Sequence, residues 1–334
     1  MKFFDNSRLS DCKRCPRYFY FRHERDLTRE RDNKGFAKSP PLAFGSSWHD
    51  AMDVVWLELA GVKNSSNQDV LELASDAFNR RWEEEGMTPV EEMSMEEADQ
   101  LNPRLPSVAY EMLYEYIETR SNFLRNPELE LIAVEQPFAV PLDPDNPELF
   151  YVGRLDKVFS IRGDIFVGEH KTSSMYSVSS TFRPSFIDSF SPNSQVDGYI
   201  YAAHSLYGNK ARGVWVDAAL VHKNVHNGFQ IIPIERNLSQ IDAWLWEVQY
   251  WIQWIEYNRE SLTECGPNDP ILAAFPKNTV ACQDYGGCQF APLCKGHANP
   301  YFDSEPPPGY KQEHWSPFEE LELIKIGFEP GVGD

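Results

Sequence analysis

The spacing of apolar residues divides the chain into an N-terminal part with helical periodicity and a following part with strand periodicity. An apolar residue every three or four positions predicts a helix, and four early segments show this spacing: 7–22, 46–60, 69–85 and 105–125. From residue 131 apolar and polar residues alternate, which predicts strands, in three successive runs: 131–140, 151–160 and 164–173. The sequence "SIRGD" at 160–164 places a glycine turn between the last two runs, so we expect a hairpin.

The second half of the chain alternates between helical and strand patterns. "SQVDGYIYAAHSLYG" (194–208) predicts a helix that ends at Gly208, and the runs 213–222 and 229–235 predict two more strands. A long helix is expected from Ser239, where Asp242 three residues later gives a capping-box-like start, to about residue 262. These elements indicate an α/β protein with a mixed central sheet flanked by helices.

The composition indicates a globular protein. The 334 residues are 42% hydrophobic and 13% aromatic, which is enough for one sizeable core with appendages or for two domains. No stretch approaches ~18 consecutive apolar residues, and the N-terminus lacks a basic flank before an apolar run, so we expect a cytoplasmic protein without membrane contact. In a reducing cytoplasm the six cysteines are expected to be metal ligands or core residues rather than disulfides.

The charge narrows the expected mode of nucleic-acid binding. A net charge of −20 argues against a surface covered with phosphate-binding residues, because such contacts need clustered Lys and Arg. A local basic groove is still compatible with it. Many of the acids fall in "RRWEEEGMTPVEEMSMEEADQ" (80–100), which is typical of a solvated helical face or an insertion rather than of a site.

Two carboxylates and a lysine stand on the predicted hairpin, in "GRLDKVFSIRGDIFVGEHKTS". Glu169 and Lys171 point to the same face of a strand, with Asp156 on the neighbouring strand. Two carboxylates from adjacent strands suit Mg²⁺ or Mn²⁺, and the lysine can stabilise charge on a phosphate or orient a water. The alternative is an ordinary cross-strand ion pair, which this spacing alone does not exclude.

Three evenly spaced cysteines near the C-terminus suggest a second metal centre. Cys282, Cys288 and Cys294 are each separated by five residues in "CQDYGGCQFAPLC", unlike the paired C-x₂-C knuckles of most zinc ribbons. Three thiolates do not complete a four-ligand site, and the N-terminal segment offers Cys12 and Cys15 as the fourth ligand. An iron-sulfur cluster, a zinc ion and free core thiols are all open readings of this pattern.

An ordered set of motifs gives these residues a context: "CPRYFYFR", "GSSWHDAM", "VEQPFAV", "GRLDKV", "GEHKTS", "QVDGY" and the C-terminal cysteines. In this order, over about residues 8 to 296, the chain resembles the RecB-like branch of the PD-(D/E)xK nuclease superfamily. It looks especially like the iron-sulfur members related to CRISPR-associated RecB-type exonucleases and the AddB nuclease domain. The resemblance implies a restriction-endonuclease-like fold. One departure is that no proline precedes Asp156, although Gly153 gives the branch's G-x-x-D arrangement.

The resemblance also implies roles for individual residues. Asp156 and Glu169 match the metal-binding acids, Lys171 matches the catalytic lysine, and His49 matches the helix histidine that completes the coordination of Mg²⁺ or Mn²⁺. Without the resemblance, His49 would be read as an ordinary helix-face histidine.

Further roles follow from the same resemblance. Gln195 and Tyr199 match the Q-x-x-x-Y motif, which contacts DNA or positions the lysine, and Glu135 corresponds to a supporting acid of the preceding strand. Cys15 is implied as the partner of Cys282, Cys288 and Cys294 in a [4Fe-4S] cluster, with Cys12 as the alternative and zinc as the rival cofactor.

The function expected from these motifs is that of a metal-dependent DNA exonuclease acting on single-stranded ends. The expected organisation is a helical region with His49 and the first cluster cysteine (1–130), a nuclease core (131–262), a cysteine segment (263–297) and an extended tail (298–334). Two rivals share the sequence features: a DNA-processing subunit that works with an integrase or a helicase, and a catalytically silent scaffold that binds DNA ends.

Overall fold

The computed structural model describes residues 1–30, 38–62, 64–301 and 305–316. These residues form two compact units, each assembled from segments that are distant in the sequence. Unit 1 comprises Met1–Asp32, Pro137–Gly153 and Leu238–Asp334, and unit 2 comprises Asn33–Gln136 and Arg154–Asn237. The expected division into four consecutive ranges follows the sequence instead, and it stays a prediction about which part carries which role.

The main sheet is mixed, and its strands include β3 (Leu129–Pro141), β4 (Leu149–Ile161), β5 (Asp164–Ser173), β8 (Ala211–Leu220) and β9 (Phe229–Glu235). Unit 2 holds β5, β8 and β9 with β3 up to residue 136 and β4 from residue 154, and the remaining parts of β3 and β4 belong to unit 1. Strand β3 pairs with β4, and the order then runs β4-β5-β8-β9. The β4–β5 and β8–β9 pairs are antiparallel, whereas β5 and β8 are parallel. The parallel pair requires a crossover, and the chain supplies it through α8 (Ser194–Tyr207).

The β4–β5 hairpin forms where the glycine turn predicts it. Arg162 and Gly163 both have positive φ, at 54° and 91°, so the turn uses a conformation that glycine adopts without a steric penalty. Strand β5 has the predicted bounds, 164–173. The hairpin prediction is confirmed, and it brings the two strands that carry Asp156 and Glu169 side by side.

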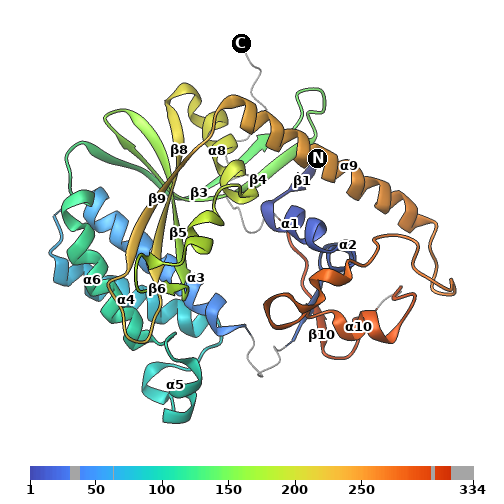
Figure 1. Cartoon of the computed structure of the whole chain (residues 1–334), viewed down its shortest axis with the longest axis horizontal. Helices are drawn as coiled ribbons and strands as arrows, with labels where there is room; N and C mark the ends of the chain where they lie inside the picture. The colour runs from blue at the N-terminus through green and yellow to red at the C-terminus, as the bar shows by residue number, and fades with distance from the viewer. Residues whose placement is uncertain (31–37, 63, 302–304, 317–334) are drawn as a thin grey trace. The chain divides into compact units, whose positions relative to one another are not determined.

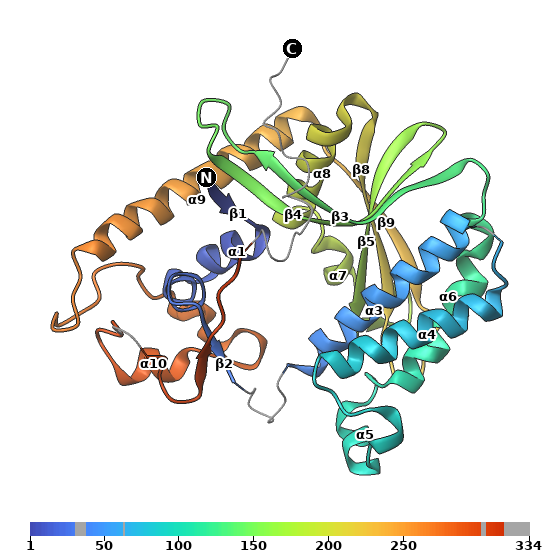
Figure 2. The same ribbon diagram turned by 180° about the vertical axis from the view of Figure 1, so that it is seen from behind.

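Helices cover the sheet of unit 2 and enclose its core. Figures 1 and 2 show α3 (Pro40–Trp56), α4 (Asn67–Glu84) and α6 (Pro106–Leu124) grouped on one side of the strands, with α8 on the other side of β5 and β8. The buried cluster beneath α3, α4 and α6 includes Trp48, Phe78 and Tyr116, and it reaches Phe159 of β4. This core holds α3 in place against the sheet, since aromatic side chains of this size bury 150–250 Å² each.

Three predicted helices of unit 2 are confirmed, with small changes at their ends. The spacing in 69–85 and 105–125 corresponds to α4 and α6, and 194–208 corresponds to α8, which ends at Gly208 with φ 58°. The helix expected over 46–60 begins earlier, at Pro40, because a proline is well placed in the first turn of a helix. Its last residues form a π-helical segment, Leu57–Val62.

The acidic stretch 80–100 covers the end of α4, a 3₁₀ turn (Val90–Glu92) and α5 (Met95–Leu101). Its acids lie at or near the surface, as expected for a solvated face. The remaining short elements of unit 2 are β6 (Tyr176–Ser177), β7 (Thr181–Phe182), α7 (Pro184–Asp188) and the 3₁₀ turn Gly208–Lys210.

Unit 1 joins the two ends of the chain. Its elements are β1 (Lys2–Phe4), α1 (Asn6–Arg14), α2 (Pro16–Phe19), the π-helical turn Tyr20–Glu24, β2 (Leu27–Arg29), α9 (Leu238–Thr263), the 3₁₀ segment Thr279–Gly286, α10 (Ala291–Gly296) and β10 (Tyr310–Gln312). Strand β1 pairs in parallel with Leu149–Tyr151 of β4, and β2 pairs with β10. The last pairing shows that the expected extended tail contributes a strand, while residues 302–304 and 317–334 lie outside the described residues.

The segment 7–22, which the sequence predicts to be helical although it carries Pro16, is helical on both sides of an interruption at Cys15. This residue has extended backbone angles, φ −161° and ψ 110°, between α1 and α2. The following Pro16 explains the break: its ring clashes with a helical conformation of the preceding residue, and its nitrogen has no hydrogen to donate.

None of the helices in the described ranges is long and apolar enough to cross a membrane.

Candidate active site

Two buried carboxylates stand next to each other on the β4–β5 hairpin. The antiparallel register pairs Lys157 with Gly168, so Asp156 and Glu169 are the next residues along the two strands. Asp156 is 8% exposed and Glu169 is 2% exposed. The backbone N–H of His170 donates to Asp156 Oδ2 at 3.0 Å, which fixes one oxygen of this carboxylate.

His49 reaches the same carboxylate from helix α3. Its Nδ1 lies 3.1 Å from Asp156 Oδ2. Burial alone lowers the pKa of His49, but the Asp156 carboxylate outweighs burial and raises that pKa to about 9. Burial likewise raises the pKa of Asp156, yet His49, Lys157 and Lys171 outweigh it and hold the pKa of Asp156 well below its ordinary range. Asp156 is therefore ionised at every physiological pH.

Glu169 and Lys171 form an ion pair on the same face of β5. Only one oxygen of Glu169 is used, because Oε2 is buried and has no hydrogen-bond partner. Burial and the neighbouring Asp156 raise the pKa of Glu169 to about 7. A buried carboxylate oxygen without a partner is costly, so this atom identifies a place where a further positive group would be stabilising.

Lys171 remains charged in this setting. Burial lowers its pKa, but Glu169 and Asp156 outweigh burial and raise that pKa above its ordinary value. The side chain is 32% exposed, so the ammonium is accessible from solvent while it contacts Glu169. It can stabilise negative charge on a bound group, but it is poorly suited to accept a proton near neutral pH.

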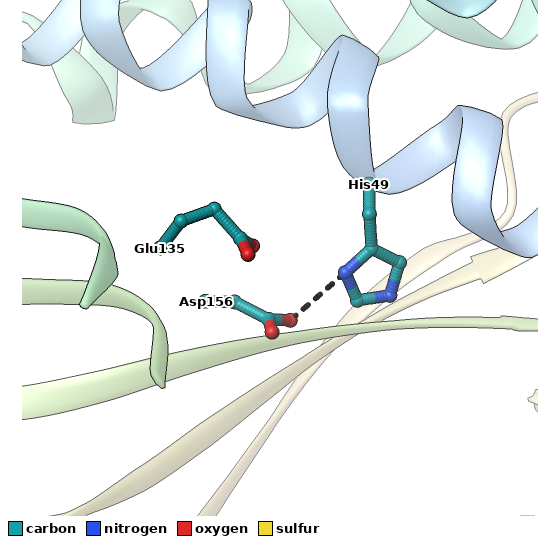
Figure 3. A group of neighbouring side chains, drawn as sticks. All are labelled: His49, Glu135 and Asp156. Carbon is teal, nitrogen blue, oxygen red and sulfur yellow. Dashed lines mark ion pairs between the residues drawn. The ribbon is translucent and has the colours of Figure 1, made fainter. Parts of the chain in front are cut away.

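Glu135 is the third acid at this position. It lies in β3 with φ 50°, and its carboxylate, His49 and Asp156 each offer a ligand atom within 4.8 Å of the other two (Figure 3). Across the described ranges, no other group of three or more His, Cys, Asp or Glu ligand atoms lies that close together. The sequence suggested a supporting role for Glu135, whereas the structure places it beside the other two groups.

An ion pair between Lys157 and Asp53 lies next to the site and was not predicted. Lys157 is fully buried and donates to Asp53, which lies one helical turn after His49 on α3. Burial raises the pKa of Asp53 to about 6, although Lys157 acts in the opposite direction. The i, i+4 spacing of His49 and Asp53 was the available sequence signal, since residues at that spacing share a helix face.

The predicted helix pair on α8 is present, but its role is not tested. Gln195 Nε2 donates to Tyr199 Oη at 3.1 Å, in agreement with their i, i+4 spacing. Asn193 caps the helix by accepting from the backbone N–H groups of Gln195 and Val196. A contact of Gln195 or Tyr199 with DNA, or with Lys171, stays a prediction.

The comparisons with known proteins agree with this geometry. A family model for the PD-(D/E)XK nuclease superfamily matches residues 6–295. The chain belongs to the PD-(D/E)XK nuclease superfamily. A search of curated proteins found no match. The mixed sheet with helices on both sides is consistent with the restriction-endonuclease-like fold of this superfamily.

Membership of the PD-(D/E)XK superfamily implies a divalent ion, and the residues present fit one. The donor set of one imidazole and several carboxylates suits Mg²⁺ or Mn²⁺. The unpartnered Oε2 of Glu169 supplies a ligand atom that no described residue uses. His49, Glu135 and Asp156 therefore offer ligand atoms for the ion that PD-(D/E)XK nucleases use. Glu169 lies outside this group, and its role as a ligand stays a prediction.

All six cysteines belong to unit 1, whereas His49, Glu135, Asp156 and Glu169 belong to unit 2. Cys15 Sγ accepts the backbone N–H of Asn278 at 3.3 Å, which connects the start of α2 to the cysteine segment. Burial raises the pKa of Cys294 to about 11, with Cys15 and Cys288 contributing in the same direction. No three cysteine sulfurs of the described residues lie within 4.8 Å of one another, so the thiols do not form a ready-made ligand sphere.

The two remaining cysteines have different surroundings. Cys12 is buried in α1, where burial and the neighbouring Cys15 raise its pKa to about 12. Cys265 donates to the carbonyl oxygen of Ser261 at 3.4 Å. Because burial raises the pKa of Cys288 and Cys294 as well, a raised pKa does not exclude Cys12 as a metal ligand, and the choice of the N-terminal ligand between Cys12 and Cys15 stays a prediction.

Proposed function

We propose that this protein is a metal-dependent DNA exonuclease that acts on single-stranded DNA ends in the cytoplasm. The observation that carries the proposal is the pair of buried acids on adjacent strands, Asp156 and Glu169, with a half-buried histidine and a charged lysine beside them. The superfamily match supports nucleic-acid hydrolysis. The choice of free single-stranded ends rests on the ordered RecB-like motifs.

Each residue has a chemical task in this proposal. His49, Asp156 and Glu169 would hold a Mg²⁺ or Mn²⁺ ion, which activates a water and stabilises negative charge on the phosphate. The N–H of His170 and the ring of His49 fix the orientation of Asp156. Lys171 places its positive charge where the attacked phosphate gains negative charge, and its raised pKa keeps it protonated during the reaction.

The test is a nuclease assay with end-labelled single-stranded, double-stranded and circular single-stranded DNA in Mn²⁺. We expect the linear single strand to be degraded and the circle to resist, because an exonuclease needs an end. Asp156→Asn and Lys171→Ala should each lower the rate by at least about 100-fold. The control is Asp164→Asn on the same strand β5, where an exposed carboxylate pairs with Arg212 and its loss should leave the rate unchanged.

Four outcomes would contradict this assignment. Activity that survives both Asp156→Asn and Lys171→Ala would exclude this site. Cleavage of the circle would make the protein an endonuclease. DNA binding without cleavage in the wild type would favour the silent scaffold, and cleavage that appears only with a bound integrase or helicase would favour the processing subunit.

We further propose that Cys15, Cys282, Cys288 and Cys294 bind a [4Fe-4S] cluster, as in the iron-sulfur members of the RecB-like branch. Cys15 contributes to the raised pKa of both Cys288 and Cys294, and Cys282 contributes to that of Cys288; this supports the set, because such an influence requires the thiols to be neighbours. No three of these sulfurs lie within 4.8 Å of one another in the described residues, so the choice of a cluster over a zinc ion rests on the resemblance to the iron-sulfur members of the branch.

The cluster has its own experiment. Anaerobically purified protein should be brown and contain iron and sulfide, and Cys282→Ser should lose both. The matched control is Cys265→Ser, which should retain them. Colourless protein with stoichiometric zinc would overturn the assignment in favour of zinc. Iron that is retained in Cys15→Ser but lost in Cys12→Ser would show that Cys12, and not Cys15, is the N-terminal ligand.

A further inference from the structure

Glu135, His49 and Asp156 come from three different elements and converge on one point. Helix α3 supplies the histidine, and strands β3 and β4 supply the two carboxylates (Figure 3). Their ligand atoms lie within 4.8 Å of one another. Oxygen and nitrogen atoms at about 2.1 Å from a common ion are at most about 4.2 Å apart. Small rotations of the side chains therefore suffice to place all three atoms around one ion.

A second observation at the same point also indicates a bound cation. Glu169 is 2% exposed, its Oε2 has no partner, and the charge of Asp156 acts strongly on it. An ion held by Asp156 would lie close to this unpartnered oxygen and offset its charge. The trio and the free oxygen are independent observations, because Glu169 is not a member of the trio.

We propose that Glu135 is a direct ligand of the catalytic divalent ion, together with His49 and Asp156. The proposal rests on the metal-dependent function proposed above. It assigns a ligand role to Glu135, for which the sequence motifs suggest only a supporting role. The positive φ of Glu135 turns its carboxylate toward the other two groups, at a cost of order 1 kcal/mol for a residue other than glycine.

The competing explanation is a purely structural ion pair. Arg154 NH1 lies 3.1 Å from Glu135 Oε2, and both side chains are partly exposed, at 43% and 32%. An exposed pair of this kind contributes little to stability. The two roles predict different effects of removing Arg154 on the affinity for Mn²⁺. If the ion pair is structural, removing either Arg154 or Glu135 breaks the pair and should have the same effect. If Glu135 is a ligand, removing Arg154 only takes away a cation that competes with the metal ion for the carboxylate.

The experiment measures Mn²⁺ binding by calorimetry without DNA, on protein freed of loosely bound ions by gel filtration. Glu135→Gln should raise the Kd for Mn²⁺ by at least about tenfold, and Asp156→Asn should do so as a positive control. The matched control is Glu130→Gln, an exposed glutamate of the same strand, which should leave the Kd unchanged. Arg154→Gln should leave the affinity equal or tighter.

Each outcome decides the question. Wild-type affinity in Glu135→Gln together with weakened binding in Asp156→Asn would overturn the ligand role and leave the proposed function standing. Equal weakening by Glu135→Gln and Arg154→Gln would assign Glu135 to the ion pair. If Glu135→Gln fails to fold, Glu135→Asp keeps the charge and retracts the carboxylate, and unchanged affinity in that variant would also overturn the proposal. A wild type that neither binds Mn²⁺ nor cleaves DNA would refute the metal-dependent function itself.

Discussion

Replacing Glu169 by glutamine should stabilise the metal-free protein and abolish its activity. The perturbation keeps the shape of the side chain and removes its charge. In the wild type, burial and Asp156 raise the pKa of this carboxyl from 4.5 to about 7. The folded protein therefore pays for ionised Glu169 at alkaline pH, and the neutral amide removes that cost.

The magnitude follows from the pKa shift. A shift of this size corresponds to about 3 kcal/mol once Glu169 is fully ionised. At pH 5 the carboxyl is mostly protonated in the folded protein, and the cost is under about 1 kcal/mol; by pH 8.5 nearly the whole cost is present. The stability difference between Glu169→Gln and wild type should thus grow by about 2 to 3 kcal/mol from pH 5 to pH 8.5.

The direction of the pH effect has a definite sign. Between about pH 4.5 and 7 the folded state holds a proton on Glu169 that the unfolded state has lost. Stability therefore falls as pH rises through this window. His49, whose pKa Asp156 and Glu169 raise to about 9, also contributes stability that is lost as pH rises. Because Glu169→Gln removes one of these charges, the difference between the two proteins also contains a smaller contribution of opposite sign from His49.

The assay is urea unfolding without divalent ions, followed by circular dichroism and tryptophan fluorescence at both pH values. The control is Asp164→Asn, whose exposed carboxylate should give a difference that does not change with pH. Added Mn²⁺ should stabilise the wild type more than Glu169→Gln, since the ion binds a carboxylate better than an amide. A stability difference that is the same at pH 5 and pH 8.5 would refute the reasoning.

Two further predictions concern the scaffold. Gly213→Ala should lower the free energy of unfolding by at least about 2 kcal/mol, because the new Cβ would lie 2.2 Å from the carbonyl oxygen of Ile234 on the paired strand. The control in the same urea unfolding assay is Gly296→Ala, where no atom lies within 4 Å of the new Cβ. Lys157→Met should cost about 3 kcal/mol at pH 8, because it leaves the half-buried Asp53 without its cation. The cost should be smaller at pH 5, where Asp53 is mostly protonated, and an equal loss at both pH values would contradict this.

The sequence predicts well the parts of the fold whose pattern is long and local. Strand β5 and helices α4, α6 and α8 follow from apolar periodicity over ten or more residues. The strands β1, β2 and β10 have three residues each and carry too little pattern to recognise. They form because distant segments pair with them, as Tyr310–Gln312 does with Leu27–Arg29.

The same division applies to the site. Asp156, Glu169 and Lys171 could be selected because strand alternation and hairpin pairing bring them together. The position of Glu135 could not be derived, since it depends on a positive φ inside a strand, which alternation does not anticipate. The pair formed by Lys157 and Asp53 was also missed, because it joins a strand to a helix 104 residues away.

The charges around the site show why a metal and protons should compete for it. Glu135, Asp53, Asp156 and Glu169 are four acids, and Arg154, Lys157, Lys171 and protonated His49 are four cations paired with them. Without an ion the site is therefore balanced by His49 in its charged form, which its raised pKa maintains at neutral pH. A histidine that binds a metal must be neutral. Binding of the ion consequently has to displace the proton of His49 and, below about pH 7, the proton that Glu169 then holds, so the positive charge brought by the ion replaces charge that the site already holds. The affinity for the ion should therefore rise with pH up to about 9. This exchange of protons for a metal ion takes place within the site, so it does not require a basic protein surface, in agreement with the net charge of −20.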